Sequence, residues 1–228
     1  MMAERAMTGA RLNWYPRHAS ELTEGERQRA FDARPCLDDR ERAIRLGYLD
    51  DVESAAPNDP WFTLRVAFGR EKAVERDLAA RDIEAFVPMR KGPARMVRGR
   101  KRPALMIPAV TGYVMVRTVV TDKICAGLTA VENVVQLVGA EGAPHPVSHK
   151  EITRFRLMAD EGKLDWEALS AVTYGAGEKV RITDGPFGSF LGVVVTPNTK
   201  GRGDVVVEAD VFGRKTPVTL PLALIEKL

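Results

Sequence analysis

The stretch KVRITDGPFGSFLGVVV (residues 179–195) decides the fold of the C-terminal part of this 228-residue chain. Val180 and Ile182 alternate with charged residues, as in a strand with one buried face. Residues 184–188 predict a turn, because glycine accepts a positive φ and proline fixes its own φ. Residues 190–195 are apolar and β-branched, which predicts a second strand directly after the turn.

More short strands are expected between this stretch and the end of the chain. Residues 205–207 predict a strand, and 211–220 predict another that is interrupted at Gly213. Short strands at this spacing are typical of a closed barrel, so residues 178–228 are expected to form a small five-stranded antiparallel β-barrel. Side chains fill the interior of such a barrel, and it must therefore bind partners with its outer surface and loops.

The middle of the chain, residues 61–160, mixes both periodicities. Strands are predicted at 61–66, 83–87, 105–107, 111–120 and 131–138, and helices at 70–81 and 122–128. Ser148, followed three residues later by Glu151, is a capping-box pattern and predicts the start of a further helix. This order favours an α+β sandwich, with helices on one face of an antiparallel sheet.

The flanking segments have a different character. Residues 53–60 contain two prolines and an Asn-Asp pair, which favour turns and predict a domain boundary near residue 60. Residues 1–60 are expected to be an N-terminal extension, partly helical or disordered, with one helical pattern at 37–49 and no continuous core. Residues 161–177 are expected to be a flexible linker.

Composition limits the possible classes. Hydrophobic residues make up 45% and charged residues 29%, with no apolar run long enough to cross a bilayer. The N-terminus does not resemble a secretory signal, so the expected location is the cytoplasm. The net charge is −3 over residues 1–60, +7 over 61–160 and −1 over 161–228. The middle segment therefore favours a nucleic acid or an acidic protein surface as partner.

The densest positive charge lies in residues 90–102, which contain seven cations and no acid. These cations are Arg90, Lys91, Arg95, Arg98, Arg100, Lys101 and Arg102. Their glycine and proline neighbours argue against a rigid helix that reads bases. The segment is either a solvated loop or, as we expect, a binding element that contacts phosphates of DNA or RNA.

Catalytic and metal-binding patterns are not recognisable. Cys36 and Cys125 are too few and too far apart for a disulfide framework or a metal cluster. His145 and His149 have a helical ligand spacing, but Pro146 interrupts it and no third ligand is near. We expect a non-enzymatic protein that has no cofactor and no metal.

Two groups of segments resemble one known family. Residues 177–195 resemble the KOW motif of the NusG transcription elongation factors, and 211–218 resemble the strand that follows it there. Residues 61–66, 86–88 and 111–116 resemble the N-terminal (NGN) domain of the same family. The resemblance covers residues 61–228 and implies a ferredoxin-like antiparallel α/β sandwich tethered to the barrel.

The resemblance also implies a function. A bacterial factor of this family binds RNA polymerase through its NGN domain and acts on transcription elongation, termination or antitermination, and here the polymerase-binding residues would be Val110 and Tyr113. The family has Phe-Pro where this chain has Val110 and Thr111. The KOW domain would recruit the termination factor Rho or a small-subunit ribosomal protein, through Phe187, Phe190, Val211, Phe212 and Arg214. The implied protein is a monomer that does not bind membranes.

Other interpretations stay open. The acidic extension and the altered Val110-Thr111 pair favour a specialised paralogue, whose basic segment could contact non-template DNA or RNA. The β-branched runs at 193–195 and 205–207 predict a C-terminal domain that remains a barrel. A ribosome-associated KOW protein that binds RNA is the alternative function, although the near-neutral C-terminal segment speaks against it.

Overall fold

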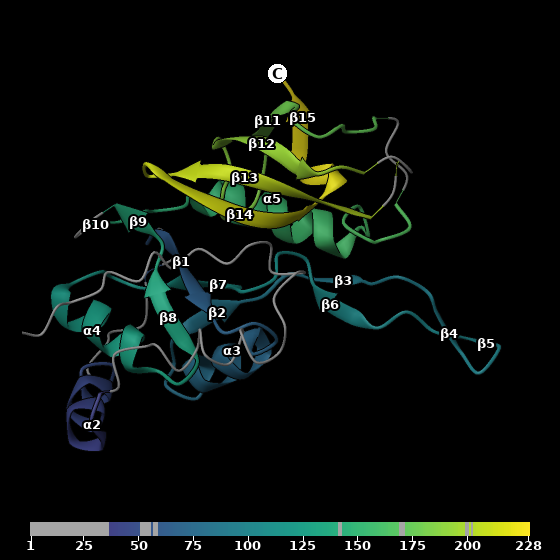
Figure 1. The fold of residues 1–228 in the computed structure, drawn as a ribbon. Coiled ribbons are helices and arrows are strands. Elements are labelled where there is room, and N and C mark those ends of the chain that lie inside the picture. Colours follow the sequence, from purple (N-terminus) through teal and green to yellow (C-terminus); the bar gives the residue numbers. More distant parts are fainter. Residues whose placement is uncertain are drawn as a thin grey trace, which may run out of the picture. The chain divides into compact units, whose positions relative to one another are not determined.

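The computed structural model describes residues 37–228, apart from 51–55, 57–58, 141–142, 169–171, 199–200 and 202. Figure 1 shows the order of the helices and strands along the chain. Residues Pro35–Leu228 form one compact unit, to which the whole description below refers. No helix in the described residues is both long and apolar enough to span a membrane.

Four strands form the N-terminal sheet. They are β1 (Trp61–Val66), β2 (Glu84–Phe86), β7 (Tyr113–Arg117) and β8 (Val134–Leu137), and their order in the sheet is β2-β7-β1-β8. All neighbouring strands are antiparallel. Consecutive residues of β1 and β7 are buried, which means that both faces of this sheet are covered.

Helices α3 (Glu71–Ala79) and α4 (Asp122–Ala130) cover one face of the N-terminal sheet. Val74 and Leu78 of α3 and Leu128 of α4 pack there with apolar residues of β1 and β7. Helix α5 (His149–Asp160) packs instead with Trp61 and Met115, in a second core. The sequence pattern predicted all helices on one face of the sheet. The structure differs, because α5 packs in the core that it shares with the C-terminal part of the chain.

The capping box predicted for α5 is confirmed. The Glu151 amide donates to Ser148 Oγ at 3.2 Å, and the Ser148 amide donates to Glu151 Oε2 at 3.0 Å. Two amides that would otherwise lack partners at the helix start are satisfied in this way. The helix begins at this point and directs Ile152 and Phe155 into the second core.

The C-terminal sheet has five antiparallel strands. They are β11 (Lys179–Ile182), β12 (Leu191–Thr196), β13 (Asp204–Val211), β14 (Arg214–Pro221) and β15 (Ile225–Lys227), with η1 (Leu222–Leu224) between the last two. Their order is β14-β13-β12-β11-β15. The interruption predicted at Gly213 is a two-residue turn, since Phe212 and Gly213 have φ of 54° and 75°. Closure of the sheet into a barrel stays a prediction.

The basic segment is more regular than the sequence suggested. Strand β3 (Met89–Lys91) pairs with β6 (Met106–Pro108), and β4 (Arg95–Val97) pairs with β5 (Arg100–Arg102). Arg98 and Gly99, between β4 and β5, both have positive φ, at 51° and 74°. A two-residue turn of this kind matches the twist of a hairpin, so a short ladder forms where a loop was expected. Strands β9 (Gly139–Ala140) and β10 (Ala143–Pro144) form another short pair.

Part of the N-terminal extension belongs to the folded unit. Helix α2 (Asp39–Gly47) begins at Asp38, whose carboxylate accepts from the Glu41 amide at 2.6 Å. Leu49, just after α2, is fully buried in the core with α3 and α4. A Cβ on Gly127 of α4 would lie 2.7 Å from Leu49 Cδ2, so only glycine permits this close contact. The sequence pattern showed no core here because Leu46 and Leu49 pack on residues that lie far along the chain.

Candidate functional site

The residue before Tyr113, which is predicted to bind polymerase, is held by the buried carboxylate of Glu71. The Gly112 amide donates to Glu71 Oε1 at 2.6 Å, and the Gly112 carbonyl accepts from the Val66 amide at 2.8 Å. Gly112 has φ of 84°, which L side chains rarely adopt. The bend before β7 is therefore fixed by hydrogen bonds at both the amide and the carbonyl of Gly112. This bend sets the direction of the Tyr113 side chain.

Tyr113 contacts a residue predicted to bind a different partner. Its ring lies 4.8 Å from the ring of Phe187, centroid to centroid, in an edge-to-face arrangement at 85°. Tyr113 is 7% exposed and Phe187 is 1% exposed, and Val110 is also buried. The family resemblance implied a polymerase-binding surface for Tyr113 and a separate partner-binding surface for Phe187. In the structure, the two rings pack against each other.

His145 extends this aromatic contact. Its ring centroid lies 5.6 Å from that of Phe190 and 5.0 Å from that of Phe212, and the two phenylalanine rings are 5.2 Å apart. In the sequence analysis, His145 was weighed only as a metal ligand together with His149. His149 has a different neighbour, because its Nδ1 accepts from Trp61 Nε1 at 3.3 Å. No local pattern marks His145 as a packing residue for the C-terminal sheet.

The other residues predicted on the C-terminal domain differ in exposure. Val211, at the end of β13, is buried, and Arg214, at the start of β14, is exposed. Phe190 and Phe212 are only partly buried. Of this group, Arg214 is the residue that is most open to a partner in the present arrangement.

Arg90 is set apart from the other cations of the basic segment. Its Nη2 lies 2.5 Å from Asp204 Oδ2, and its Nη1 donates to the Leu164 carbonyl at 3.2 Å. The guanidinium also lies 5.8 Å from the centre of the Trp166 ring. The Arg90 side chain is 3% exposed. It joins β3 to β13 and is not available to a phosphate in this arrangement.

The segment between α5 and β11 is held at the same place. The Lys91 amide donates to Asp165 Oδ1 at 2.8 Å, and the Trp166 amide donates to the Lys91 carbonyl at 2.9 Å. Leu164 is fully buried. A Cβ on Gly203 would lie 2.9 Å from Trp166 Cζ2, so the indole packs directly on backbone. Residues 164–166 are therefore packed and hydrogen-bonded, whereas a flexible linker was expected over 161–177. The bounds of that linker stay a prediction.

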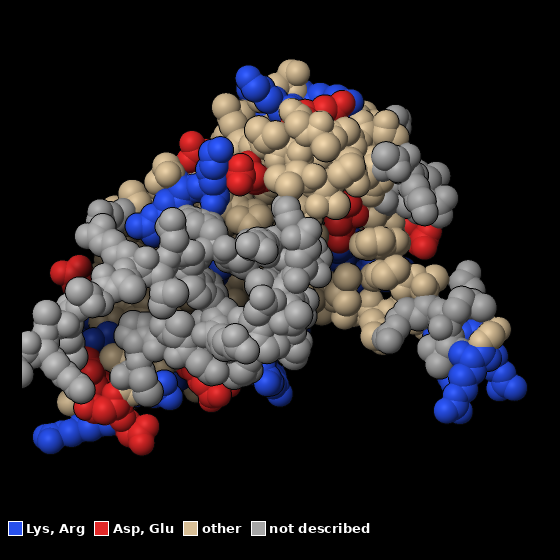
Figure 2. Space-filling model, in the orientation of Figure 1, with Lys and Arg blue, Asp and Glu red and all other residues tan. Residues whose placement is uncertain are grey.

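The exposed cations gather at the β4–β5 hairpin. Arg98, Arg100 and Arg102 are exposed there, and Lys91 is exposed at the end of β3. The backbone of Arg95 and Lys101 belongs to the same ladder. Figure 2 shows blue side chains concentrated at this hairpin, without red ones among them. The hairpin thus offers several guanidinium groups to solvent, on an element that carries no acidic residue.

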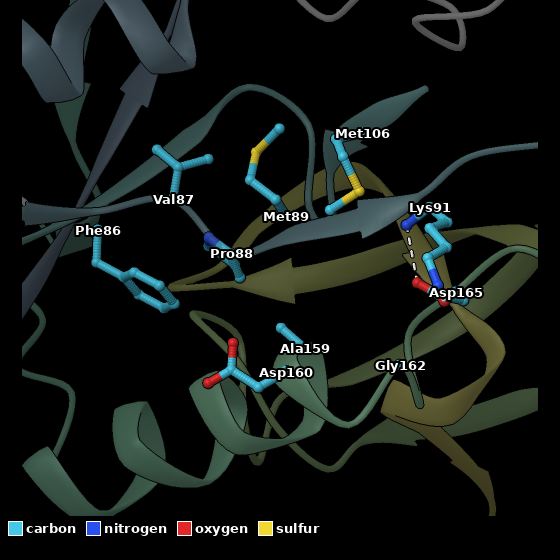
Figure 3. A pocket seen from close by; sticks show the side chains of 10 residues that line it. All are labelled: Phe86, Val87, Pro88, Met89, Lys91, Met106, Ala159, Asp160, Gly162 and Asp165. Atoms are coloured by element: carbon cyan, nitrogen blue, oxygen red, sulfur yellow. Dashed lines mark hydrogen bonds and ion pairs between the residues drawn. The ribbon is translucent and has the colours of Figure 1, made fainter. Parts of the chain in front are cut away.

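A cavity of about 420 Å³ lies between the β2–β3 segment and the end of α5. Its walls combine apolar and polar groups, and Figure 3 shows Phe86, Pro88, Met89 and Met106 on one side with Asp160 opposite. Lys91 Nζ lies 3.8 Å from Asp165 Oδ2 at its edge. The residues that line this cavity include no nucleophile beside a base, so they do not form a recognisable catalytic site.

Perturbed ionisable groups lie away from these surfaces. Burial, with Asp122 nearby, raises the pKa of Cys125 in α4. Burial also raises the pKa of Tyr174, whose hydroxyl donates to the Ile225 carbonyl at 2.8 Å. A hydrogen bond from Lys227 lowers the pKa of Glu178. In the described part of the chain, His, Cys, Asp and Glu residues do not gather in a group that could hold a metal ion.

Comparisons with known proteins agree with the resemblance. The family model described as transcription termination factor nusG matches residues 59–156. The transcription termination/antitermination protein NusG of Treponema pallidum (strain Nichols) is 30% identical over 182 residues, covering 74% of this chain and 98% of that protein. The protein of the same name from Escherichia coli (strain K12) is 27% identical over 186 residues, covering 76% and 99%.

Among solved structures, "Domain interaction in Thermotoga maritima NusG" is similar, with 24% identity and a TM-score of 0.39, covering 75% of this chain and 97% of that one. The alignment with this chain covers nearly the whole length of the Treponema protein. The chain therefore belongs to the NusG family of transcription termination/antitermination proteins.

Proposed function

We propose that this protein is a bacterial transcription factor that binds RNA polymerase through the surface around Val110 and Tyr113 and uses its C-terminal sheet, closed as a KOW barrel, to recruit a second partner. Rho and a small-subunit ribosomal protein are the proposed partners. They would contact Phe187, Phe190, Val211, Phe212 and Arg214. The protein would act in the cytoplasm, without enzymatic activity.

The observation that carries the proposal is the contact between Tyr113 and Phe187. Two surfaces that each bind a protein are apolar, and in the absence of those partners they lose exposure to water by packing on each other. We name this contact, together with the His145 cluster and the Arg90–Asp204 pair, the closed arrangement. Polymerase binding then requires the closed arrangement to open, and the apparent affinity is lowered by the fraction of molecules that are closed.

The first prediction concerns core RNA polymerase. Phe212→Gly removes one ring from the His145 cluster and suits the positive φ of 54° at this turn position. An aromatic contact contributes about 0.5–1.5 kcal/mol, so the apparent affinity of the full chain for polymerase should rise about twofold to tenfold. His145→Ala, which removes the other side of the same contact, should have a similar effect. Titration of labelled protein with core polymerase measures both.

Tyr113→Ala serves as the opposing variant, because it opens the same arrangement but removes the proposed polymerase contact. Combined with Phe212→Gly, it should abolish the gain in affinity. If Tyr113→Ala/Phe212→Gly binds polymerase as tightly as Phe212→Gly alone, the surface around Tyr113 is not the polymerase contact. If neither Phe212→Gly nor His145→Ala strengthens binding, the closed arrangement does not limit it.

The β4–β5 hairpin is proposed to contact the nucleic acid of the transcription complex. The support is the group of exposed guanidiniums at Arg98, Arg100 and Arg102. A two-stranded ladder of this size presents them along one short element, where phosphate oxygens can accept several hydrogen bonds. Arg90 is excluded from this role in the closed arrangement, because Asp204 already neutralises it.

The second prediction concerns salt dependence. Replacing Arg98, Arg100 and Arg102 together with alanine should weaken binding to single-stranded DNA and lower the slope of log affinity against log salt by about 2, at roughly 0.7 per phosphate contact. Fluorescence anisotropy over a salt series measures the slope. A control variant with alanine at Arg40, Lys163 and Lys215 removes the same charge from exposed positions elsewhere. Equal slopes for the two variants would refute a local contact.

A further inference from the structure

One buried carboxylate joins two turns at the same end of the N-terminal sheet. Glu71, the first residue of α3, is 2% exposed. Its Oε1 accepts from the Gly112 amide at 2.6 Å and from the Gly69 amide at 3.3 Å. Gly69 belongs to the turn between β1 and α3, and Gly112 belongs to the bend before β7. A single side-chain oxygen therefore fixes these two turns relative to each other.

The backbone of both turns has a conformation that glycine favours. Gly69 has φ of 76° and Gly112 has φ of 84°. The Gly112 carbonyl is also engaged, since it accepts from the Val66 amide at 2.8 Å. A backbone hydrogen bond thus holds the bend on its carbonyl side, whereas its amide side depends on the Glu71 side chain.

The hydrogen-bond partners of Glu71 indicate its role. Within the part of the chain that the structure describes, they are two amides, and no lysine or arginine pairs with this carboxylate. The N-terminus of α3 adds a favourable partial charge. Such a carboxylate binds backbone amides instead of balancing a cation, so its removal acts first on the turns that donate to it.

Gly112 passes this restraint to Tyr113, the first residue of β7. Tyr113 pairs with Arg65 of β1 and is 7% exposed. If Glu71 is removed, the partly buried Gly112 amide loses its acceptor, which is unfavourable, so the bend changes until water reaches the amide. The start of β7 and the Tyr113 ring then move with the bend.

We propose that Glu71 is a positioning residue for polymerase binding, which holds Gly112 and thereby Tyr113 in the conformation that polymerase contacts. The inference rests on the proposed role of Tyr113 in that contact. Glu71 itself does not touch the partner, because its side chain is buried. What it contributes is an acceptor oxygen at a defined place, and not a charge on the surface.

The test compares three substitutions at Glu71 in titrations of the full chain with core RNA polymerase. Glu71→Gln keeps an acceptor oxygen at the same distance from the main chain, so the affinity should stay within about twofold of the parent. Glu71→Asp keeps the charge but is one methylene shorter, so it cannot reach both amides and should weaken binding about tenfold. Glu71→Ala should weaken binding by a similar factor. All variants carry Phe212→Gly, so that loosening of the closed arrangement does not mask the loss.

Glu75→Ala is the matched control on the same helix. Glu75 Oε1 also accepts from a backbone amide, that of Val87 at 3.0 Å, but Val87 packs in the core on the other face of the sheet from Tyr113. Its substitution removes the same type of hydrogen bond and should leave the affinity for polymerase within about twofold of the parent. Urea denaturation of each variant establishes that the chain is folded under the binding conditions.

Two results overturn the inference, and a third overturns the proposed function on which it rests. If Glu71→Asp and Glu71→Ala bind as tightly as the parent while Tyr113→Ala weakens binding, Glu71 does not position the contact. If Glu71→Asp retains binding and Glu71→Gln loses it, polymerase binding depends on the charge and not on the acceptor oxygen. If Tyr113→Ala leaves binding unchanged, the surface around Tyr113 is not the polymerase contact.

Discussion

Asp204→Ala is expected to lower the free energy of unfolding by about 3 kcal/mol, because it leaves the Arg90 guanidinium buried without its counter-charge. The Arg90 side chain is 3% exposed and lies 2.5 Å from Asp204, so water cannot readily replace the carboxylate. Its second hydrogen bond, to the Leu164 carbonyl, does not neutralise the charge. Urea denaturation followed by circular dichroism measures the change.

A paired variant distinguishes lost charge pairing from lost packing. Arg90→Met/Asp204→Leu removes both charges and should recover most of the stability, since replacing a buried ion pair with apolar residues is often neutral. Lys215→Ala, which removes an exposed partner of Glu208, should change stability by less than about 0.5 kcal/mol. A loss below about 1 kcal/mol for Asp204→Ala would mean that Arg90 finds water or another acceptor once the carboxylate is removed.

Phe155→Ala is expected to lower the free energy of unfolding by about 4 kcal/mol, because it removes a large side chain from a closely packed core. Phe155 is fully buried in the core that contains Trp61 and Met115 together with residues of the C-terminal sheet. A Cβ on Gly185 would lie 3.3 Å from Phe155 Cζ, so the ring contacts the turn after β11 directly. Truncation leaves a cavity between α5 and both sheets.

Leu157→Ala is the matched control for Phe155→Ala, two residues further along the same helix. Leu157 is 54% exposed, and its truncation should change stability by less than about 0.5 kcal/mol. Thermal and urea denaturation of both variants test the difference. If Phe155→Ala unfolds in two separate transitions, the two sheets are stable independently and α5 only connects them. A single transition at lower urea concentration is the expected outcome.

The two stability predictions and the polymerase prediction concern the same closed arrangement. Asp204 and Phe155 lie where the C-terminal sheet meets the rest of the unit, and Tyr113 packs on Phe187 in the same core. A change that weakens this contact should lower stability and raise the proposed affinity for polymerase together. The opposite sign of the two effects is what distinguishes an inhibitory contact from one that only supports the fold.

The sequence by itself determined the local elements. The Ser148–Glu151 capping box began α5, the alternation in residues 179–182 produced β11, and the glycines and proline of 184–188 made the turn that follows. Each of these signals acts over a few residues, because side-chain spacing and backbone φ preferences are local properties. The same local signals, with the resemblance in residues 61–228, were enough to identify the family.

Only the tertiary structure decided which of the predicted binding residues are free. In the sequence, Arg90 is one of seven similar cations. Asp204, whose carboxylate pairs with the Arg90 guanidinium, lies 114 residues away. Tyr113 contacts Phe187, and Leu49 contacts Gly127, and the members of each pair are also far apart along the chain. No periodicity reports such pairs, because they depend on how complete sheets and helices pack to remove apolar surface from water.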